Sequence, residues 1–218
     1  MIPVEYDVLH QLIKNGRVAL NYAWENYDKL AAVEASYTLY GPPSPYLGVM
    51  AAGHLTPEKD RKLYKKPRWK RYNIYELDAN FNVIRVKHIR KDGKTDCIYH
   101  LFELDNVIYG CPFSGEKKQF YSSRICAIKY DENRPLYYAV TGPTYLWADF
   151  YEYSKPNEVI TTCYIYSPER KFTSEGLPVS WDVPIGDPNS PASVDICVEN
   201  YHQIDFRKLL DKGSVPLT

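Results

Sequence analysis

The chain has 218 residues, and its 27 Lys and Arg balance 27 Asp and Glu, so the formal net charge is zero. This length supports a hydrophobic core without disulfide or metal staples, and the zero charge excludes a global field that would recruit nucleic acid or an anionic membrane. The five Cys contain no CxxC pair, and no apolar run reaches the roughly 18 residues of a membrane helix. We therefore expect a cytoplasmic protein with no cofactor, no metal site and no membrane contact.

Residues 1–40 are predicted to form a helical hairpin. Two apolar stripes with three- and four-residue steps run through them: Val4, Val8, Leu9, Leu12 and Ile13, then Leu20, Ala23, Trp24, Tyr27, Leu30 and Ala31. Asn15-Gly16 lies between the stripes and is typical of a helix end, and Gly41-Pro42-Pro43 ends the second helix. Residues 41–68 are expected to be a connector, because their first part is rich in Gly, Pro, Ser and Ala.

Residues 69–166 are predicted to form an antiparallel β-meander, because apolar and polar residues alternate there and turn-forming residues recur at short intervals. The expected turns are Asp78-Ala79-Asn80, Asp92-Gly93, Asp105-Asn106, Ser114-Gly115, Asp131-Glu132-Asn133 and Lys155-Pro156-Asn157. Four related segments form a loose repeat within this region, and each is interpreted as one hairpin arm. They are Tyr75-Glu76-Leu77-Asp78, Phe102-Glu103-Leu104-Asp105, Ile128-Lys129-Tyr130-Asp131 and Tyr151-Glu152-Tyr153-Ser154.

Asp92-Gly93 is the strongest hairpin signal and sets a register for the strands around it. On one face this register pairs three residues of each strand: His88 with Cys97, Val86 with Tyr99 and Ile84 with Leu101. The opposite face carries four polar residues and is expected to face water: Arg85, Lys87, His100 and Asp96. The central strands are expected to bury one face against the N-terminal helices.

Residues 167–218 are predicted to be an irregular, Pro-rich and acidic region. A strand at 194–199 and a short helix near 204–210 are the exceptions. The sequence therefore predicts one α+β domain over residues 1–218, in which an N-terminal helical hairpin packs on a mainly antiparallel β-meander sheet and the Pro-rich region follows.

No catalytic or cofactor motif occurs in the sequence, so no catalytic residue is predicted. The weak candidates are His88, Cys97 and His100, since a Cys–His contact can activate a thiolate. The sequence shows no third group that would orient the contact between Cys97 and His88. A structural role for these residues is therefore the favoured interpretation. An enzyme of unknown class, with a pocket between sheet and helices, stays open as an alternative function.

A basic segment precedes the predicted sheet. Between Glu58 and Arg71 it carries Lys59, Arg61, Lys62, Lys65, Lys66, Arg68, Lys70 and Arg71, interleaved with Tyr64 and Trp69. Basic and aromatic residues together are typical of single-stranded nucleic-acid binding, so a nucleic-acid module that uses residues 59–72 is a second alternative. The zero net charge favours a solvated connector instead, and nucleic acid is not the expected partner.

An acidic block lies further along the chain. Residues 172–206 contain six acids and no Lys or Arg, with Trp181 and Tyr201 among them. Such a surface fits a basic protein, because charge complementarity steers encounter and aromatic residues anchor it. The predicted partner-binding residues are Asp182, Asp187, Asp195, Glu199 and Trp181. Neutralisation of the basic segment within the same chain is an equally good explanation of this block.

Two hairpin segments carry a family resemblance. Tyr75-Glu76-Leu77-Asp78 and Ile128-Lys129-Tyr130-Asp131 are similar to hairpins of tyrosine–aspartate repeat proteins, although the turn glycine is missing after both aspartates. Residues 70–166 also resemble the small β-rich immunity proteins encoded beside bacterial polymorphic toxins. The resemblance implies a single-domain cytosolic inhibitor that acts by tight binding. We accordingly predict a non-enzymatic immunity protein that occludes the active site of a basic toxin domain.

Overall fold

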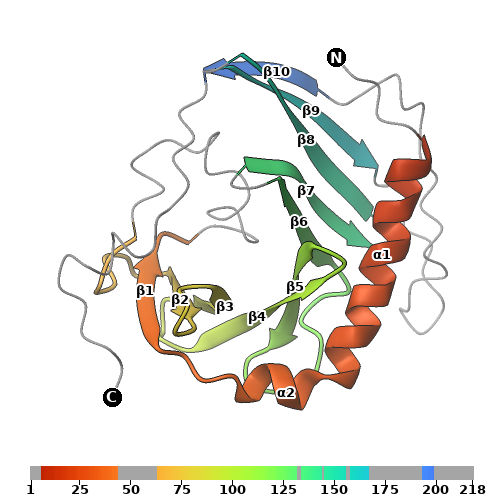
Figure 1. Ribbon diagram of the computed structural model, residues 1–218. Helices are drawn as coiled ribbons and strands as arrows, with labels where there is room; N and C mark the ends of the chain where they lie inside the picture. Colours follow the sequence, from red (N-terminus) through yellow and green to blue (C-terminus); the bar gives the residue numbers. More distant parts are fainter. Residues whose placement is uncertain are drawn as a thin grey trace. The chain divides into compact units, whose positions relative to one another are not determined.

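The computed structural model describes residues 6–43, 63–131, 134–143, 145–155, 158–166 and 193–198. They group into two compact units. Figure 1 labels the helices and strands of both. The α1 unit contains the described residues of 6–22, 104–109 and 123–198, and the α2 unit contains those of 23–103 and 110–122.

The α2 unit is built on four strands that are hydrogen-bonded in chain order, each antiparallel to the next. They are β1 (Tyr37–Gly41), β2 (Tyr72–Leu77), β3 (Val83–Ile89) and β4 (Thr95–Leu104). Helix α2 (Tyr27–Ala32) and the second half of β5 (Val107–Ser114) belong to the same unit. The strands end or begin at the predicted turns, and Gly93, Asp105 and Asn106 take the positive φ that such turns require.

The α1 unit holds most of helix α1 (Tyr6–Glu25) and five strands that are again antiparallel and in chain order. They are β6 (Ile125–Asp131), β7 (Arg134–Gly142), β8 (Tyr145–Lys155), β9 (Glu158–Tyr166) and β10 (Ser193–Val198). The predicted meander and the strand near 194–199 are thus confirmed. The four related sequence segments lie in β2, β4, β6 and β8 or directly after them, which confirms that each is one hairpin arm.

The predicted helical hairpin is wrong, because α1 continues through Asn15-Gly16 without a break. Gly16 permits close packing and does not end a helix: a Cβ atom at this position would clash with Thr141 Oγ1 and lie 3.2 Å from Ile125 Cγ2. The second expected helix is also shorter. It ends at Ala32 where Val33 turns extended, and residues 37–41 form strand β1. Neither described helix is long and apolar enough to cross a membrane.

A row of alanines explains how α1 packs so close to its sheet. Ala127, Ala139 and Ala148 lie opposite one another on β6, β7 and β8, and all three are buried. They share a sheet face with Ile125 and Thr141, the two residues that contact Gly16, because residues two apart on a strand point the same way. Small side chains on both surfaces therefore let the helix backbone approach the strands.

Replacing Gly16 with alanine is expected to destabilise the protein by about 1–3 kcal/mol, because overpacking against Thr141 outweighs the helix propensity of alanine, which is worth at most about 1 kcal/mol. Urea denaturation followed by circular dichroism measures the change. The double variant Gly16→Ala, Thr141→Ala should lose less than the sum of the single variants. Lys14→Ala, on the exposed side of the same helix, should stay within about 0.5 kcal/mol. A Gly16→Ala protein that is as stable as the parent would contradict the packing argument.

Candidate anion-binding surface

The turn between β3 and β4 presents several cations at one end of the sheet in the α2 unit. It is closed by backbone hydrogen bonds from Arg90 N to Lys94 O (2.9 Å) and from Gly93 N to Arg90 O (3.0 Å). Gly93 has φ of 77°, a conformation that costs glycine little and other residues more. The side chains of Arg90, Lys91 and Lys94 are consequently exposed on an ordered backbone.

Strand register brings a fourth cation to this turn. Tyr72 pairs with Ile89, so Arg71 and Arg90 lie just beyond the ends of neighbouring strands. Arg71, Arg90, Lys91 and Asp92 line a shallow hollow of about 360 Å³, which we call the basic hollow. Its three cations and one carboxylate give a formal charge of +2. Sequence reasoning missed this site, because the Asp92-Gly93 turn specifies only the pairing of β3 with β4, whereas the placement of residue 71 beside residue 90 comes from the pairing of β2 with β3.

Asp92 is already engaged within the basic hollow. Its carboxylate accepts hydrogen bonds from Arg90 Nη2 (2.6 Å), Arg90 Nε (3.3 Å) and Lys94 N (3.1 Å). The hydrogen bonds from Arg90, followed by the one from Lys94, lower the pKa of Asp92 and keep it ionised. Among the described residues, Arg71 and Lys91 have no ion-pair partner. These two side chains carry the uncompensated positive charge of the hollow.

The basic segment that leads to Arg71 is anchored where the structure describes it. Leu63 is buried, and Tyr64 exchanges two backbone hydrogen bonds with Tyr40 of β1 (2.7 and 2.8 Å). The guanidinium of Arg68 lies 3.9 Å from the centre of the Tyr64 ring, and Trp69 meets the same ring edge-on at 5.5 Å. The cations of residues 63–71 are exposed, as expected of a solvated connector, while the backbone that carries them is anchored at Leu63 and Tyr64.

Tyr121 is a second aromatic residue near the basic hollow. Half of its surface is exposed, and its hydroxyl donates a 3.1 Å hydrogen bond to Asp96 Oδ2 on β4. That hydrogen bond raises the pKa of Tyr121, while the charge of Arg71 acts in the opposite direction, so Arg71 is close enough to influence the ring. An exposed ring whose orientation is restrained thus lies within electrostatic range of the hollow.

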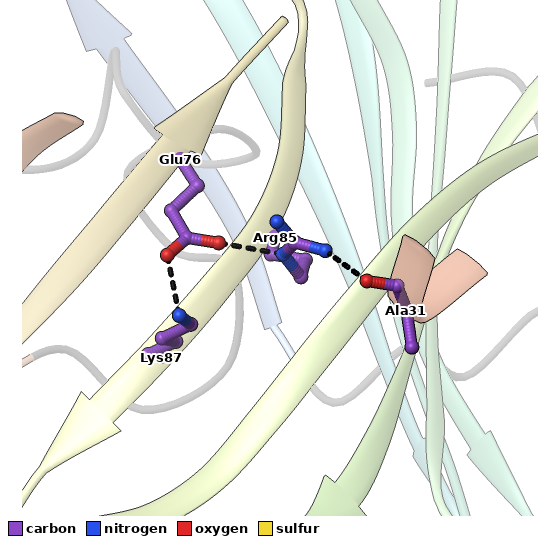
Figure 2. A network of polar contacts seen from close by, with 4 residues as sticks. All are labelled: Ala31, Glu76, Arg85 and Lys87. Atoms are coloured by element: carbon purple, nitrogen blue, oxygen red, sulfur yellow. Dashed lines mark hydrogen bonds and ion pairs between the residues drawn. The ribbon is translucent and has the colours of Figure 1, made fainter. Parts of the chain in front are cut away.

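The polar face of β3 and β4 is largely buried at Arg85 and His100 and half-buried at Lys87 and Asp96, which corrects the expectation that it faces water. Arg85 and Lys87 both pair with the Glu76 carboxylate, with 2.5 Å between Arg85 Nε and Glu76 Oε2 (Figure 2). Only 11% of the Arg85 side chain and 12% of the Glu76 side chain are exposed. His100, which is 2% exposed, packs edge-on against the rings of Tyr27 and Phe113.

Helix α2 is the reason for this burial. Arg85 Nη1 donates a 2.8 Å hydrogen bond to the carbonyl of Ala31 near the end of the helix (Figure 2). Burial raises the pKa of Glu76, but the hydrogen bonds and charges of Lys87 and Arg85 outweigh it and bring the pKa below its usual value. The network therefore joins α2 to strands β2 and β3 through charges that are compensated inside the unit.

Glu76→Gln is expected to cost about 3 kcal/mol at neutral pH, because Arg85 remains largely buried and Lys87 half-buried without their counter-ion. Since the folded pKa of Glu76 is lowered, its stabilisation is present above the ordinary value of about 4.3 and is lost as the pH falls below it. Chemical denaturation at several pH values measures both effects. Glu103→Gln, at an exposed position on β4, is the matched control. Equal stability of the two variants would argue against a structural network.

The three weak catalytic candidates, His88, Cys97 and His100, do not lie together in one site. The register confirms that His88 lies opposite Cys97, but His100 lies on the other face of β4, next to Arg85. Burial lowers the pKa of His88 to about 4, against the opposing charge of Asp96. Burial, together with the charge of Arg85, lowers the pKa of His100 to about 4. Both imidazoles are neutral at neutral pH, and no group of three potential metal ligands is found in the described ranges.

The buried histidines predict acid lability. Because each binds a proton near pH 6.5 when unfolded and only near pH 4 when folded, stability is expected to fall as the pH drops from about 6.5 to about 4. His100→Gln keeps a side-chain donor and should lessen the slope of this fall by about half. Unfolding free energies measured across that pH range provide the comparison, and an unchanged slope in the variant would show that His100 does not contribute.

None of the predicted partner-binding residues is among the described residues that line the basic hollow. Trp181, Asp182, Asp187 and Glu199 lie outside the described residues. Asp195 is in β10, where its backbone is paired with Thr161 of β9. The acidic surface therefore stays a prediction from the sequence.

Comparisons with protein-family models, curated proteins and solved structures gave no significant match for this chain.

Proposed function

We propose that the protein acts by binding a macromolecular partner, and that the basic hollow contacts anionic groups of that partner. The observation that carries the proposal is the placement of Arg71 beside Arg90 and Lys91 by the register of β2 and β3. Arginine presents a planar fork of donors that matches phosphate and carboxylate oxygens. Three cations on a restrained backbone lose less conformational freedom on binding than the same residues on a flexible loop.

A neutral chain is compatible with this function, because exposed charges act locally. At about 0.1 M salt the Debye length is about 10 Å, so an anionic group at the hollow responds to the nearest charges and little to distant acids. Within the hollow the acid Asp92 is already paired with Arg90. The local charge therefore favours an anionic partner although the formal net charge is zero.

The immunity function is a separate proposal that uses a different part of the chain. It assigns Asp182, Asp187, Asp195, Glu199 and Trp181 to a basic toxin domain and is supported by the absence of Lys and Arg from residues 172–206. The two surfaces have opposite charge and fit different partners. Both proposals treat the protein as a binding module and give no catalytic role to its residues.

Reversing charge at the basic hollow is expected to weaken polyanion binding. In the variant Arg71→Glu, Arg90→Glu, the affinity for a fluorescein-labelled single-stranded oligonucleotide or polyglutamate peptide should fall at least tenfold, because two attractive charges become repulsive. Fluorescence anisotropy in low salt gives the affinities, and the parent protein should bind more weakly as salt is raised.

The control for this variant is Lys29→Glu, which reverses an exposed cation on α2 of the same unit. It should retain nearly all of the binding. An equal loss in the control would indicate a nonspecific charge effect, and parent protein that binds neither probe would refute the proposed function.

A further inference from the structure

We infer that the anionic partner of the basic hollow is a single-stranded nucleic acid whose bases stack on Trp69 and Tyr121. This inference rests on the proposed function and adds the chemical class of the ligand. A charged hollow alone does not separate nucleic acid from an acidic polypeptide. The separating observation is that two solvent-accessible aromatic residues accompany the cations: Trp69 lies two residues before Arg71, and Tyr121 is hydrogen-bonded to Asp96 on β4.

Trp69 is two residues from Arg71, a distance of at most about 7 Å along extended chain. Its ring is partly exposed and is held against Tyr64, whose face is in turn covered by Arg68. The Trp69 indole is thus positioned by contacts on the protein side while part of its surface faces solvent. A partly exposed, restrained indole next to a cation suits a nucleotide, which offers a flat base beside a phosphate.

Tyr121 provides a second ring near the same cation. It is 50% exposed, its hydroxyl is tied to Asp96, and the charge of Arg71 reaches it. Arg71 is therefore associated with an aromatic residue in its own segment and with another that follows β5. This arrangement accommodates a phosphate at Arg71 with bases stacked on one or both rings.

The two acids near the hollow are each engaged by a donor. Asp92 accepts from Arg90 and from the Lys94 backbone, and Asp96 accepts from Tyr121. Their hydrogen bonds direct the carboxylates toward protein donors, while Arg71 and Lys91 stay available for phosphates. Because the site offers few cations, we expect a modest salt dependence, with a slope of about −0.7 in log affinity for each phosphate contacted.

The single-stranded form follows from the use of stacking. Bases in a duplex are already stacked on their neighbours, so their faces are closed to Trp69 and Tyr121. An acidic polypeptide has carboxylates for the cations but no planar rings for the aromatic residues. The three ligand classes therefore differ in how strongly they should depend on the two rings.

The test compares aromatic and charge variants with three labelled probes of similar length: single-stranded oligothymidine, duplex DNA and polyglutamate. Trp69→Leu and Tyr121→Leu should each weaken oligothymidine binding about fivefold or more, in line with the loss of one stacked base. Neither change should alter polyglutamate binding, and duplex DNA should bind the parent protein more weakly than oligothymidine. Tyr22→Leu, at an exposed tyrosine of helix α1, should leave all affinities unchanged.

Tyr121→Phe separates stacking from folding, since it keeps the ring and removes only the hydroxyl that binds Asp96. It should bind oligothymidine more tightly than Tyr121→Leu does, because the ring remains, and thermal denaturation should show that both variants fold. Oligothymidine binding that is insensitive to the aromatic changes, or polyglutamate that binds more tightly than oligothymidine, would overturn the inference and leave the proposed function standing. Failure of every polyanion to bind would overturn both.

Discussion

The register of β2, β3 and β4 determines which charged side chains meet in the α2 unit. The pairing of Glu76 with Arg85 inside the strands and the pairing of Tyr72 with Ile89 at their ends belong to the same ladder. A shift by one residue would move every side chain to the opposite face, so it would separate Glu76 from Arg85 and turn Arg71 away from Arg90. The buried network and the basic hollow are therefore consequences of one geometric constraint.

The same ladder gives its cations two different physical roles. Arg85, which is hydrogen-bonded to the end of α2, and Lys87 are partly removed from water, which is costly, and the Glu76 carboxylate compensates both. Arg71 and Lys91 lie beyond the strand ends, where water solvates them and no described acid neutralises them. Removing a buried partner is expected to lower the stability of the fold, whereas changing an exposed cation is expected to lower the affinity for a partner. This difference lets function be tested at the hollow without disturbing the fold.

Much of the strand order could be predicted from the sequence, because turn residues such as Asp92-Gly93 act locally and specify the register directly. The packing at Gly16 could not be predicted, because its close approach to Thr141 joins residues far apart in the chain. In the sequence, a glycine that ends a helix also looks the same as a glycine that permits a close contact. Likewise, the alternation of β3 indicated a wet face but contained no information that α2 would cover it. The candidate site required long-range pairing of residues 71 and 90, which inspection of single motifs did not reveal.

The charge balance of the chain has a further physical meaning. Zero net charge removes long-range attraction, so any anionic partner must be recognised at short range by the geometry of the hollow and its rings. Short-range recognition depends on restrained groups, and Arg90 is held by Asp92, Tyr121 by Asp96 and Trp69 by Tyr64. These contacts reduce the entropy lost when a ligand orders the same side chains. The acids beside the hollow therefore serve binding by orienting its donors, although their own charge opposes an anion.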